Sequence, residues 1–330
     1  ALELSIKSLG IKNKKILVTG GSGMIGRELV NLLLLRGAEV TIASLDNVKN
    51  MDERVKVRTA DLTLKHNCEI MVKGMDMVFH LAGIKGSPLM CQKKPASFSV
   101  PMQQFNLNMM EAAVKEDVEW DLYTSSVGVY KPAEVFEEDD VWKTFPSEND
   151  KFAGWAKRMG ELQAQAYQIE NNWDRFSIVR PANVYGRFDN FNPDTAMVIP
   201  SLIAKASENE VLDVWGDGSP VRDFIHALDV ARGMVHMVVN GINDPVNLGS
   251  GSGVTIKEVA ETVAGSFDPK RTINWQTDKP TGDSKRILSM SRANNFGFSP
   301  EVSLEEGIKD TVEWYLENKS LVNNRHEAFK

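Results

Sequence analysis

Short apolar runs rich in β-branched residues alternate with longer stretches of helical periodicity in the first half of the chain. Residues 16–19 form the first run, and an apolar stretch at 29–35 follows it and ends before Gly37, a residue type that favours helix C-caps. A strand followed each time by a helix predicts parallel strands joined by right-handed crossovers. We therefore predict an α/β fold with a doubly wound parallel sheet. The further runs that predict strands are 40–43, 55–59, 77–80, 122–125 and 177–180, with helical patterns such as 108–115 and 157–170 between them.

The pattern changes after Pro181. Residues 186–194 are rich in Asn, Asp, Phe and Pro, and residues 215–220 form a loop with Gly and Asp. Such clusters indicate loops, and we interpret them as parts of a smaller lobe built from returning segments. A helix at 229–239 and a strand at 246–248 are predicted to rejoin the sheet. The predicted division assigns residues 11–182 and 224–250 to the sheet domain, and residues 183–223 and 251–330 to a smaller, partly discontinuous lobe.

The composition is that of an ordinary globular protein, with 330 residues of which 42% are hydrophobic and 25% charged. The net charge of −7 argues against general binding of nucleic acid or anionic membranes. No apolar run reaches the roughly 18 residues of a membrane span, and the first residues lack the pattern of a secretory signal. Two cysteines, Cys68 and Cys91, cannot form a disulfide framework. We therefore expect a cytoplasmic protein without membrane or nucleic-acid partners.

Several isolated polar residues receive ordinary interpretations. His66, His236 and His326 have no metal-ligand spacing with cysteines or acidic residues, so no metal site is predicted. His80 ends a predicted strand and is interpreted as structural. The acidic run at 134–140 is interpreted as a solvated loop.

The segment TGGSGMIG at 19–26 lies between the first predicted strand and the first predicted helix. Gly20 allows the turn, Gly23 allows the backbone to approach a pyrophosphate, and Gly26 allows the helix to pack closely on the strand. The helix N-terminus adds N–H donors and a partial positive charge. This spacing also occurs in tight turns, but its position favours the dinucleotide site of a Rossmann fold. The cofactor-binding residues predicted here are Gly20, Ser22, Gly23, Met24, Ile25 and Gly26.

The second predicted strand bears on the choice between NAD and NADP. Asp46 lies about 20 residues after the glycine loop, where an acidic residue binds the adenosine ribose of NAD. Ser44 lies at the strand end and would tolerate a 2′-phosphate, although Lys49 is the nearest following cation. Asp46 is also compatible with a turn before Asn47. We favour NAD without excluding NADP, and we place Asp61 and Leu62, after the third strand, beside the adenine.

Further motifs follow in order: HLAG at 80–83, SS at 125–126 ahead of Tyr130, Lys157, RPANVYG at 180–186 and RDFIH at 222–226. Together with the glycine loop, they resemble the extended short-chain dehydrogenase/reductases. That family includes NAD-dependent sugar-nucleotide epimerases, dehydratases and reductases. The resemblance implies a Rossmann domain with a lobe that binds a sugar nucleotide. It also implies a homodimer, formed through the helices that flank the Ser and Lys motifs.

The resemblance assigns candidate site residues. In this family a Tyr four residues before the Lys moves the proton while hydride is transferred, and a Ser binds the same sugar oxygen. Ser126 and Lys157 match, but Ala153 occupies the position of the Tyr. The remaining cofactor candidates are Leu81, Ala82, Gly83, Lys85, Asn106, Lys157 and Pro181. The substrate candidates are Ser126, Asn183, Val198, Trp215, Arg222 and Arg286.

Each candidate taken singly has an ordinary alternative. Ser126 is compatible with a cap at a strand end, Lys157 with a solvated helix position, and Asn183 with a turn. Arg222 is equally compatible with a surface ion pair to Asp223 and with a clamp on a diphosphate. The joint occurrence of Ser126 and Lys157 behind a dinucleotide loop favours the functional interpretation.

Two groups within the family resemble different parts of the chain. HLAGIK at 80–85 and NLN at 106–108 resemble UDP-galactose 4-epimerases, whereas DNFNP at 189–193 and VIPSL at 198–202 resemble GDP-fucose synthases and favour a GDP-sugar. Gly128 and Met197 replace the Cys and His that serve the synthases as acid and base. Dehydratases and decarboxylases carry an acidic residue near position 128, which this chain lacks. These departures favour simple hydride chemistry, which means dehydrogenation, reduction, or oxidation followed by re-reduction as in a 4-epimerase.

Ala153 leaves three interpretations open. In the first, the chain is a native enzyme in which Lys157, a water or another hydroxyl moves the proton. In the second, it is an engineered Tyr→Ala variant, and in the third, a binding protein without catalysis. Retention of Ser126 and Lys157 argues against the third, and we rank the first ahead of the second. We therefore predict an NAD(P)-dependent sugar-nucleotide oxidoreductase acting on a GDP- or UDP-sugar. The alternatives are a 4-epimerase with retained NAD and a catalytically silent cofactor- or sugar-nucleotide-binding protein.

Overall fold

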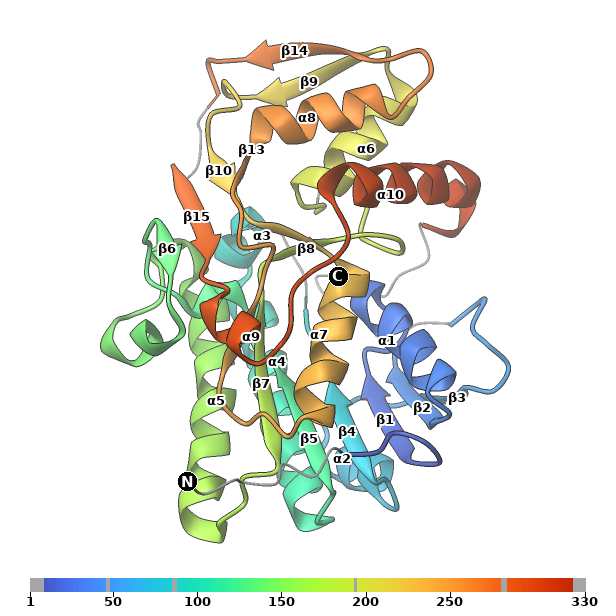
Figure 1. The fold of residues 1–330 in the computed structure, drawn as a ribbon, viewed down its shortest axis with the longest axis vertical. Coiled ribbons are helices and arrows are strands. Elements are labelled where there is room, and N and C mark those ends of the chain that lie inside the picture. Colours follow the sequence, from blue (N-terminus) through green and yellow to red (C-terminus); the bar gives the residue numbers. More distant parts are fainter. Residues whose placement is uncertain (1–8, 46–47, 85–87, 193–194, 280–283, 323–330) are drawn as a thin grey trace.

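The computed structural model describes residues 9–45, 48–84, 88–192, 195–279 and 284–322. Its centre is a seven-stranded sheet in the order β12-β7-β5-β4-β1-β2-β3, and all paired strands are parallel (Figure 1). The chain first builds outward from β1 to β3 and then returns to place β4 on the other side of β1. The predicted doubly wound Rossmann sheet is confirmed. Its strands are β1 (Lys15–Thr19), β2 (Glu39–Ser44), β3 (Lys56–Thr59), β4 (Met77–His80), β5 (Trp120–Thr124), β7 (Phe176–Pro181) and β12 (Val246–Leu248).

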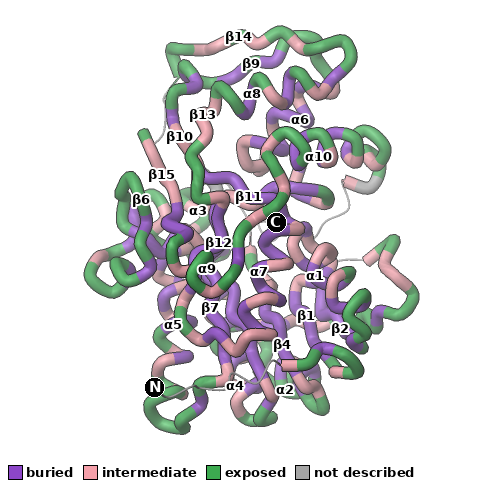
Figure 2. The backbone as a smooth tube through the Cα atoms, viewed as in Figure 1, coloured by how far each residue is buried: buried purple, intermediate pink, exposed green. Residues whose placement is uncertain are grey.

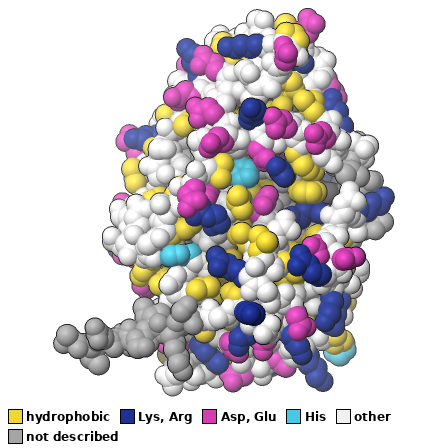
Figure 3. Space-filling model, turned by 45° about the vertical axis from the view of Figure 1, so that its right-hand side comes forward, with side chains coloured by type: hydrophobic (Ala, Val, Ile, Leu, Met, Phe, Trp, Pro, Cys, Tyr) yellow, Lys and Arg dark blue, Asp and Glu magenta, His cyan; other side chains and the backbone are white. Residues whose placement is uncertain are grey.

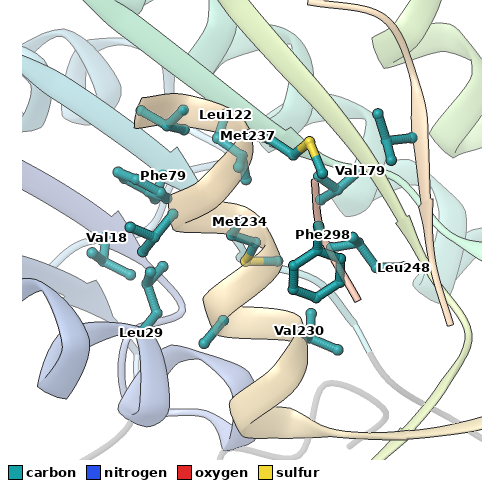
Figure 4. Close-up of a cluster of buried hydrophobic side chains, with 14 of the residues drawn as sticks. Val18, Leu29, Phe79, Leu122, Val179, Val230, Met234, Met237, Leu248 and Phe298 are labelled. Atoms are coloured by element: carbon teal, nitrogen blue, oxygen red, sulfur yellow. The ribbon is translucent and has the colours of Figure 1, made fainter. Parts of the chain in front are cut away.

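Two apolar layers bury the sheet between helices. One helix pair, α1 with α7, packs on one face, where Val18 and Phe79 of the sheet meet Leu29, Val230 and Met234 (Figure 4). Helices α2, α4 and α5 pack on the other face. The strands are accordingly buried along most of their length, except for the edge strand β3, which is exposed (Figure 2). These helices are α1 (Met24–Leu35), α2 (Lys65–Val72), α4 (Pro95–Lys115), α5 (Lys151–Asn171) and α7 (Ala227–Val239), with the short α3 (Pro88–Lys93) and α9 (Ser291–Asn295) beside them.

A smaller group of elements lies beyond the carboxyl ends of the central strands (Figure 1). It has its own apolar core between three helices and the parallel pair β9 and β14. The helices α6, α8 and α10 surround this core. The elements are α6 (Val198–Glu208), β9 (Val211–Trp215), α8 (Ile256–Gly265), β14 (Thr272–Gln276), α10 (Leu304–Asn318) and η4 (Lys319–Leu321).

A second sheet connects the two parts in the order β13-β10-β15-β6. Strand β6 comes from the first half of the chain, yet it pairs with β15 near the C-terminus. The predicted domain boundary did not anticipate this connection, and the division into two domains stays a prediction. The strands are β13 (Val254–Thr255), β10 (Val221–Arg222), β15 (Lys285–Leu288) and β6 (Val135–Phe136), and a separate pair joins β8 (Asn183–Tyr185) to β11 (Phe224–His226).

The surface carries both signs of charge. Acidic and basic side chains are interspersed on the face shown in Figure 3. Among the described residues, no helix combines the length and apolarity needed to cross a membrane.

Candidate active site

The glycine loop follows β1, and its backbone packs closely against the end of β4 and against the first turn of α1. Gly20 has φ +68°, and a Cβ there would lie 3.0 Å from the backbone nitrogen of Ala82. A Cβ on Gly26 would lie 2.2 Å from the carbonyl oxygen of Gly20, so any side chain at this position would push the helix away from the loop. Gly23 is the N-cap of α1, and Met24 and Ile25 begin its first turn. The loop therefore fits a dinucleotide pyrophosphate, since backbone N–H groups and the helix N-terminus face the carboxyl edge of the sheet.

The adenosine end of this site contains hydroxyls and a guanidinium among the described residues. Ser22 and Ser44, at the end of β2, share a hydrogen bond of 2.8 Å between their Oγ atoms. The Arg27 guanidinium donates to the carbonyl oxygens of Ser22, Lys49 and Asn50 at 3.0, 2.8 and 2.9 Å. Arg27 thus brings a positive charge close to the strand end. The sequence analysis considered only Lys49 as a cation near a 2′-phosphate. The position of Arg27 directly after Gly26 was the signal that could have identified it. Asp46 and Lys85 lie outside the described residues.

Asp61 stabilises the turn that follows β3. Its Oδ1 accepts hydrogen bonds from the backbone N–H of Thr63 at 3.0 Å and from the Thr63 hydroxyl at 2.7 Å. Leu62 is buried in the core on the α2 side. The structure thus gives both residues a local structural role, beside which an adenine contact stays a prediction.

The end of β4 is tied to the glycine-loop strand by the hydroxyl of Thr19. Thr19 Oγ1 accepts the backbone N–H groups of Leu81 and Ala82 at 3.1 and 3.0 Å. The Thr19 hydroxyl in turn donates to His80 Nδ1 at 2.7 Å. Burial lowers the pKa of His80 to about 4, which keeps the imidazole neutral. His80 thus has the structural place that the sequence suggested, and Leu81, Ala82 and Gly83 lie beside the glycine loop.

The same hydrogen-bond chain continues to helix α5. The neutral His80 donates from Nε2 to Asn106 Oδ1 at 2.8 Å, and Asn106 Nδ2 donates to the Tyr123 hydroxyl at 3.3 Å. Tyr123 in turn donates to the backbone carbonyl of Lys157 at 3.0 Å. Asn106 is 1% exposed. Its buried amide is satisfied by protein groups and links His80 to Tyr123, and a contact with the cofactor stays a prediction.

Ser126 and Lys157 are brought together by close packing of α5 against the short helix η1 (Val127–Val129). A Cβ on Gly154 would lie 2.5 Å from the carbonyl oxygen of Gly128. Ser126 Oγ caps η1 by accepting from Gly128 N at 3.1 Å. Lys157 Nζ donates to the carbonyl oxygen of Thr124, the last residue of β5, at 2.8 Å.

Burial lowers the pKa of Lys157 to about 8, against the opposing effect of Glu161. The amine is therefore mainly protonated at neutral pH but close to titration. Ala153 lies half-buried on the same helix four residues earlier, and Phe152 beside it is exposed. Neither supplies a hydroxyl, so the proton-transfer group expected at position 153 is missing.

A buried ion pair supports this arrangement from behind. Glu161, one turn after Lys157, accepts from Arg180 Nε at 2.9 Å and from its Nη2 at 2.6 Å. Ser125 donates to the same carboxylate at 2.5 Å. Arg180 immediately precedes Pro181, the last residue of β7. The charge pair thus holds the ends of β5 and β7 against α5, and sequence reasoning missed Glu161 because nothing in its local pattern marks it.

The network extends into the acidic run at 134–140. Arg180 donates from Nη1 to the Tyr130 hydroxyl at 3.0 Å and to the Glu138 carbonyl at 2.9 Å. Glu138 Oε1 accepts the backbone N–H of Asn247 at 3.1 Å, and Glu138 is only 5% exposed. The prediction of a wholly solvated acidic loop was wrong, because the Glu138 carboxylate is buried and accepts a hydrogen bond from Asn247 on β12.

Two substrate candidates far apart in sequence become neighbours. Arg222 on β10 pairs directly with Arg286 on the parallel strand β15. Residues in register on parallel strands project to the same face, so both side chains lie on one face of this sheet, where two cations would suit a diphosphate. Arg286 also donates from Nη2 to Asp150 Oδ2 at 2.9 Å. Asn183 donates from Nδ2 to the carbonyl of Asp223 at 3.0 Å, which anchors β8 next to this sheet.

The remaining candidates are more widely distributed. Val198 begins α6, and Trp215 ends β9 with its side chain exposed. No contact in the described part of the chain links either of them to Ser126 or Lys157, so a role toward the nucleotide stays a prediction.

Comparisons with known proteins agree with this geometry. The profile described as "NAD dependent epimerase/dehydratase family" matches residues 16–249. The chain is 31% identical over 317 residues to putative GDP-L-fucose synthase 2 from Arabidopsis thaliana, covering 93% of each protein. It is 28% identical to dTDP-4-dehydro-6-deoxy-D-allose reductase from Streptomyces bikiniensis, covering 92% of this chain and 96% of the relative.

A solved epimerase from Methanothermobacter thermautotrophicus, Mth375, superposes with a TM-score of 0.83 at 25% identity, covering 97% of this chain and 98% of the other. The glycine loop, the Ser126 and Lys157 geometry and the match over residues 16–249 lead to one conclusion. The chain belongs to the NAD dependent epimerase/dehydratase family.

Proposed function

We propose that the protein is an NAD(P)-dependent oxidoreductase of a nucleotide-linked sugar, working as a reductase of a GDP-linked 4-dehydro-6-deoxyhexose. The observation that carries this proposal is the geometry of the reaction end. Ser126 and Lys157 lie at the same carboxyl edge of the sheet as the dinucleotide loop, and Arg222 and Arg286 lie in register on adjacent strands, where we infer a diphosphate site. This combination fits a ligand that carries a sugar hydroxyl or carbonyl and a diphosphate.

The residues have separate roles in this reaction. The nicotinamide, when bound, supplies or accepts the hydride. The Lys157 amine binds a ribose hydroxyl of the cofactor, and the Ser126 hydroxyl donates to the sugar oxygen on which charge develops. Arg222 and Arg286 bind the diphosphate and so hold the sugar against the cofactor.

The proposed substrate rests on the relatives. Two of them are named as a GDP-L-fucose synthase and a dTDP-linked 4-dehydro-6-deoxy sugar reductase, and both cover nearly the full chain. Gly128 and Met197 offer no side-chain acid or base of the synthase type. We therefore propose reduction of the keto group rather than double epimerisation.

A 4-epimerase that retains its cofactor is the second candidate. It is favoured by the similarity to the Methanothermobacter epimerase and by a UDP-glucose 4-epimerase from Thermotoga maritima, which superposes with a TM-score of 0.79 at 25% identity and covers 92% of this chain and 99% of the other. Such an enzyme would interconvert sugar nucleotides without net consumption of cofactor.

One assay series separates these functions. Small molecules released from the purified protein are identified by mass, and the protein is then mixed with NADH or NADPH and a GDP- or dTDP-linked 4-dehydro-6-deoxyhexose. Stoichiometric loss of absorbance at 340 nm supports the reductase. Interconversion of UDP- or GDP-hexoses without such loss supports the epimerase. Cofactor binding without turnover in either assay supports a silent binding protein.

We also propose a homodimer formed through α4 and α5. These helices pack on one another, and each carries exposed apolar residues seven positions apart, Val100 and Leu107 on α4 and Leu162 and Ile169 on α5. That spacing places each pair on one helix face. A protein carrying both Leu107→Glu and Leu162→Glu is expected to elute as a monomer in size-exclusion chromatography with light scattering. Leu35→Glu, at an exposed site on α1, is the matched control and should stay dimeric.

Cys68 and Cys91 are both free thiols, which agrees with the cytoplasmic location that we propose.

A further inference from the structure

The missing group at position 153 leaves the proton of the reaction to another residue, and a carboxylate lies nearby. Asp150 is the last residue of η3 (Glu148–Asp150) and the N-cap of α5. A Cβ built on Gly128 would lie 3.7 Å from Asp150 Cβ, 3.9 Å from Asp150 Cγ and 3.5 Å from Ser126 Oγ. The Asp150 carboxyl group and the Ser126 hydroxyl therefore flank the same small space, which Gly128 leaves without a side chain.

The conformation of Asp150 is unusual for its position. An Asp at a helix N-cap normally accepts a hydrogen bond from the backbone of the first turn, but Asp150 makes no such side-chain bond. Its Oδ2 instead accepts from Arg286 Nη2 at 2.9 Å. Ala153 follows Asp150 by three residues and lies in the first turn of α5.

The neighbouring ionisable groups Lys157 and Cys91 are less suited to transferring the proton of the reaction. Lys157 is bound to the Thr124 carbonyl and is needed for the cofactor. Burial, with the Asp150 charge as the second cause, raises the pKa of the Cys91 thiol to about 11, so Cys91 stays protonated and is no base at neutral pH. Asp150, by contrast, combines an acidic side chain with a position across the space at Gly128 from Ser126, three residues before Ala153.

We propose that Asp150 is the general acid and base of the reaction and takes the place of the phenol that Ala153 lacks. This inference rests on the proposed reductase function. In the reductive direction, the carbonyl carbon gains hydride from the reduced nicotinamide and the π electron pair moves to the carbonyl oxygen. In the complex Arg286 turns from Asp150 to the substrate diphosphate, so that the Asp150 carboxyl group can hold a proton. The carbonyl oxygen takes that proton while Ser126 donates a hydrogen bond to it. The resulting Asp150 carboxylate is reprotonated by solvent, and oxidation follows the reverse course.

The test is a double-mutant cycle with Ala153→Tyr, assayed with a GDP-linked 4-dehydro-6-deoxyhexose and the preferred reduced cofactor. Asp150→Asn is expected to lower kcat by about 100-fold or more, the size of a lost acid–base step, with the cofactor Kd unchanged. Asp150→Glu should retain most of the rate. In the Ala153→Tyr background, Asp150→Asn should cost less than about 10-fold, because the added phenol moves the proton. Asp139→Asn removes another aspartate–arginine pair, to Arg292 at 2.7 Å and with a more exposed carboxylate, and serves as the control.

An unchanged kcat in Asp150→Asn would overturn the proposal. An equal loss of kcat in both backgrounds would also overturn it, because a purely structural role gives that result. If the wild-type chain turns over neither the GDP-linked nor the dTDP-linked 4-dehydro-6-deoxyhexose, the proposed function fails separately. The role of Asp150 is then tested by the absorbance titration of the phenol that Ala153→Tyr adds. That phenol should ionise at lower pH when Asp150 is also replaced by Asn, and an unmoved titration would overturn the assignment of Asp150.

Discussion

The two ends of the candidate site are built in different ways. The cofactor end is centred on one continuous segment, from β1 through the glycine loop into α1, and its fit depends on positions such as Gly26 where a side chain has no room. The reaction end collects side chains from distant segments, among them Ser126, Asp150, Lys157 and Arg286. The first end depends on backbone contacts, whereas the second depends on the pairing of charges in a partly buried place. Substitutions should therefore affect binding at one end, and stability and chemistry at the other.

The largest effect is expected from the buried ion pair at the reaction end. Glu161→Ala leaves Arg180 as a buried charge without its partner, and removal of one partner of such a pair typically costs about 3–5 kcal/mol. Urea denaturation followed by circular dichroism should show a correspondingly lower free energy of unfolding. The matched control is Asp140→Asn, which breaks the exposed pair with Lys143 and should change stability little. Equal effects of the two substitutions would show that the buried pair at the reaction end contributes no more to stability than an exposed pair.

The second prediction concerns the pH dependence of stability through Lys157. Its pKa is lowered from 10.5 to about 8 in the folded protein, so between about pH 8 and 10 the unfolded chain binds more protons than the folded one. The free energy of unfolding should therefore gain about 1–3 kcal/mol from this group as the pH rises through that range. Below pH 8 the cost of burying the charge is fully present. Lys157→Met should remove this rise, whereas Lys143→Met at an exposed site should retain it.

At the cofactor end, Gly26→Ala is expected to weaken binding of the dinucleotide. The added Cβ would lie 2.2 Å from the Gly20 carbonyl oxygen, and overpacking of this kind costs about 1–3 kcal/mol. The Kd of the cofactor, measured by calorimetry, should rise by about 10- to 100-fold. Gly265→Ala is the control, because a Cβ at the end of α8 meets nothing within 4 Å. A Gly26→Ala protein with the wild-type Kd would show that the close packing of loop and helix is dispensable.

The smallest expected effect is a change of cofactor preference. Ser44→Asp places a carboxylate at the end of β2 beside Ser22, where it would bind ribose hydroxyls and repel a 2′-phosphate. The ratio of kcat/KM for NADH over NADPH should rise by about tenfold. Glu39→Asp at the opposite, exposed end of the same strand is the control. An unchanged ratio would place the 2′ position away from Ser44.

The family pattern could be predicted well at the cofactor end. The TGGSGMIG segment, the strand before it and the helix after it are local features, and the parallel sheet follows from the repeated strand–helix order. Asn106 shows the limit of this approach. Its motif predicts contact with the cofactor, which stays a prediction, but nothing in the sequence indicated the hydrogen bonds of its amide to His80 and Tyr123.

The sequence by itself determined the sheet, the glycine loop, the Ser126 and Lys157 pair and the missing tyrosine at position 153, because these depend on short-range spacing along one strand, loop or helix. Only the tertiary structure decided which distant charges meet. It paired Arg180 with Glu161, set Arg222 beside Arg286 and placed Asp150 next to Gly128. Each pairing joins residues of different elements, 19 residues apart for Glu161 and Arg180, and their burial and strand register depend on how the whole sheet and both layers of helices pack.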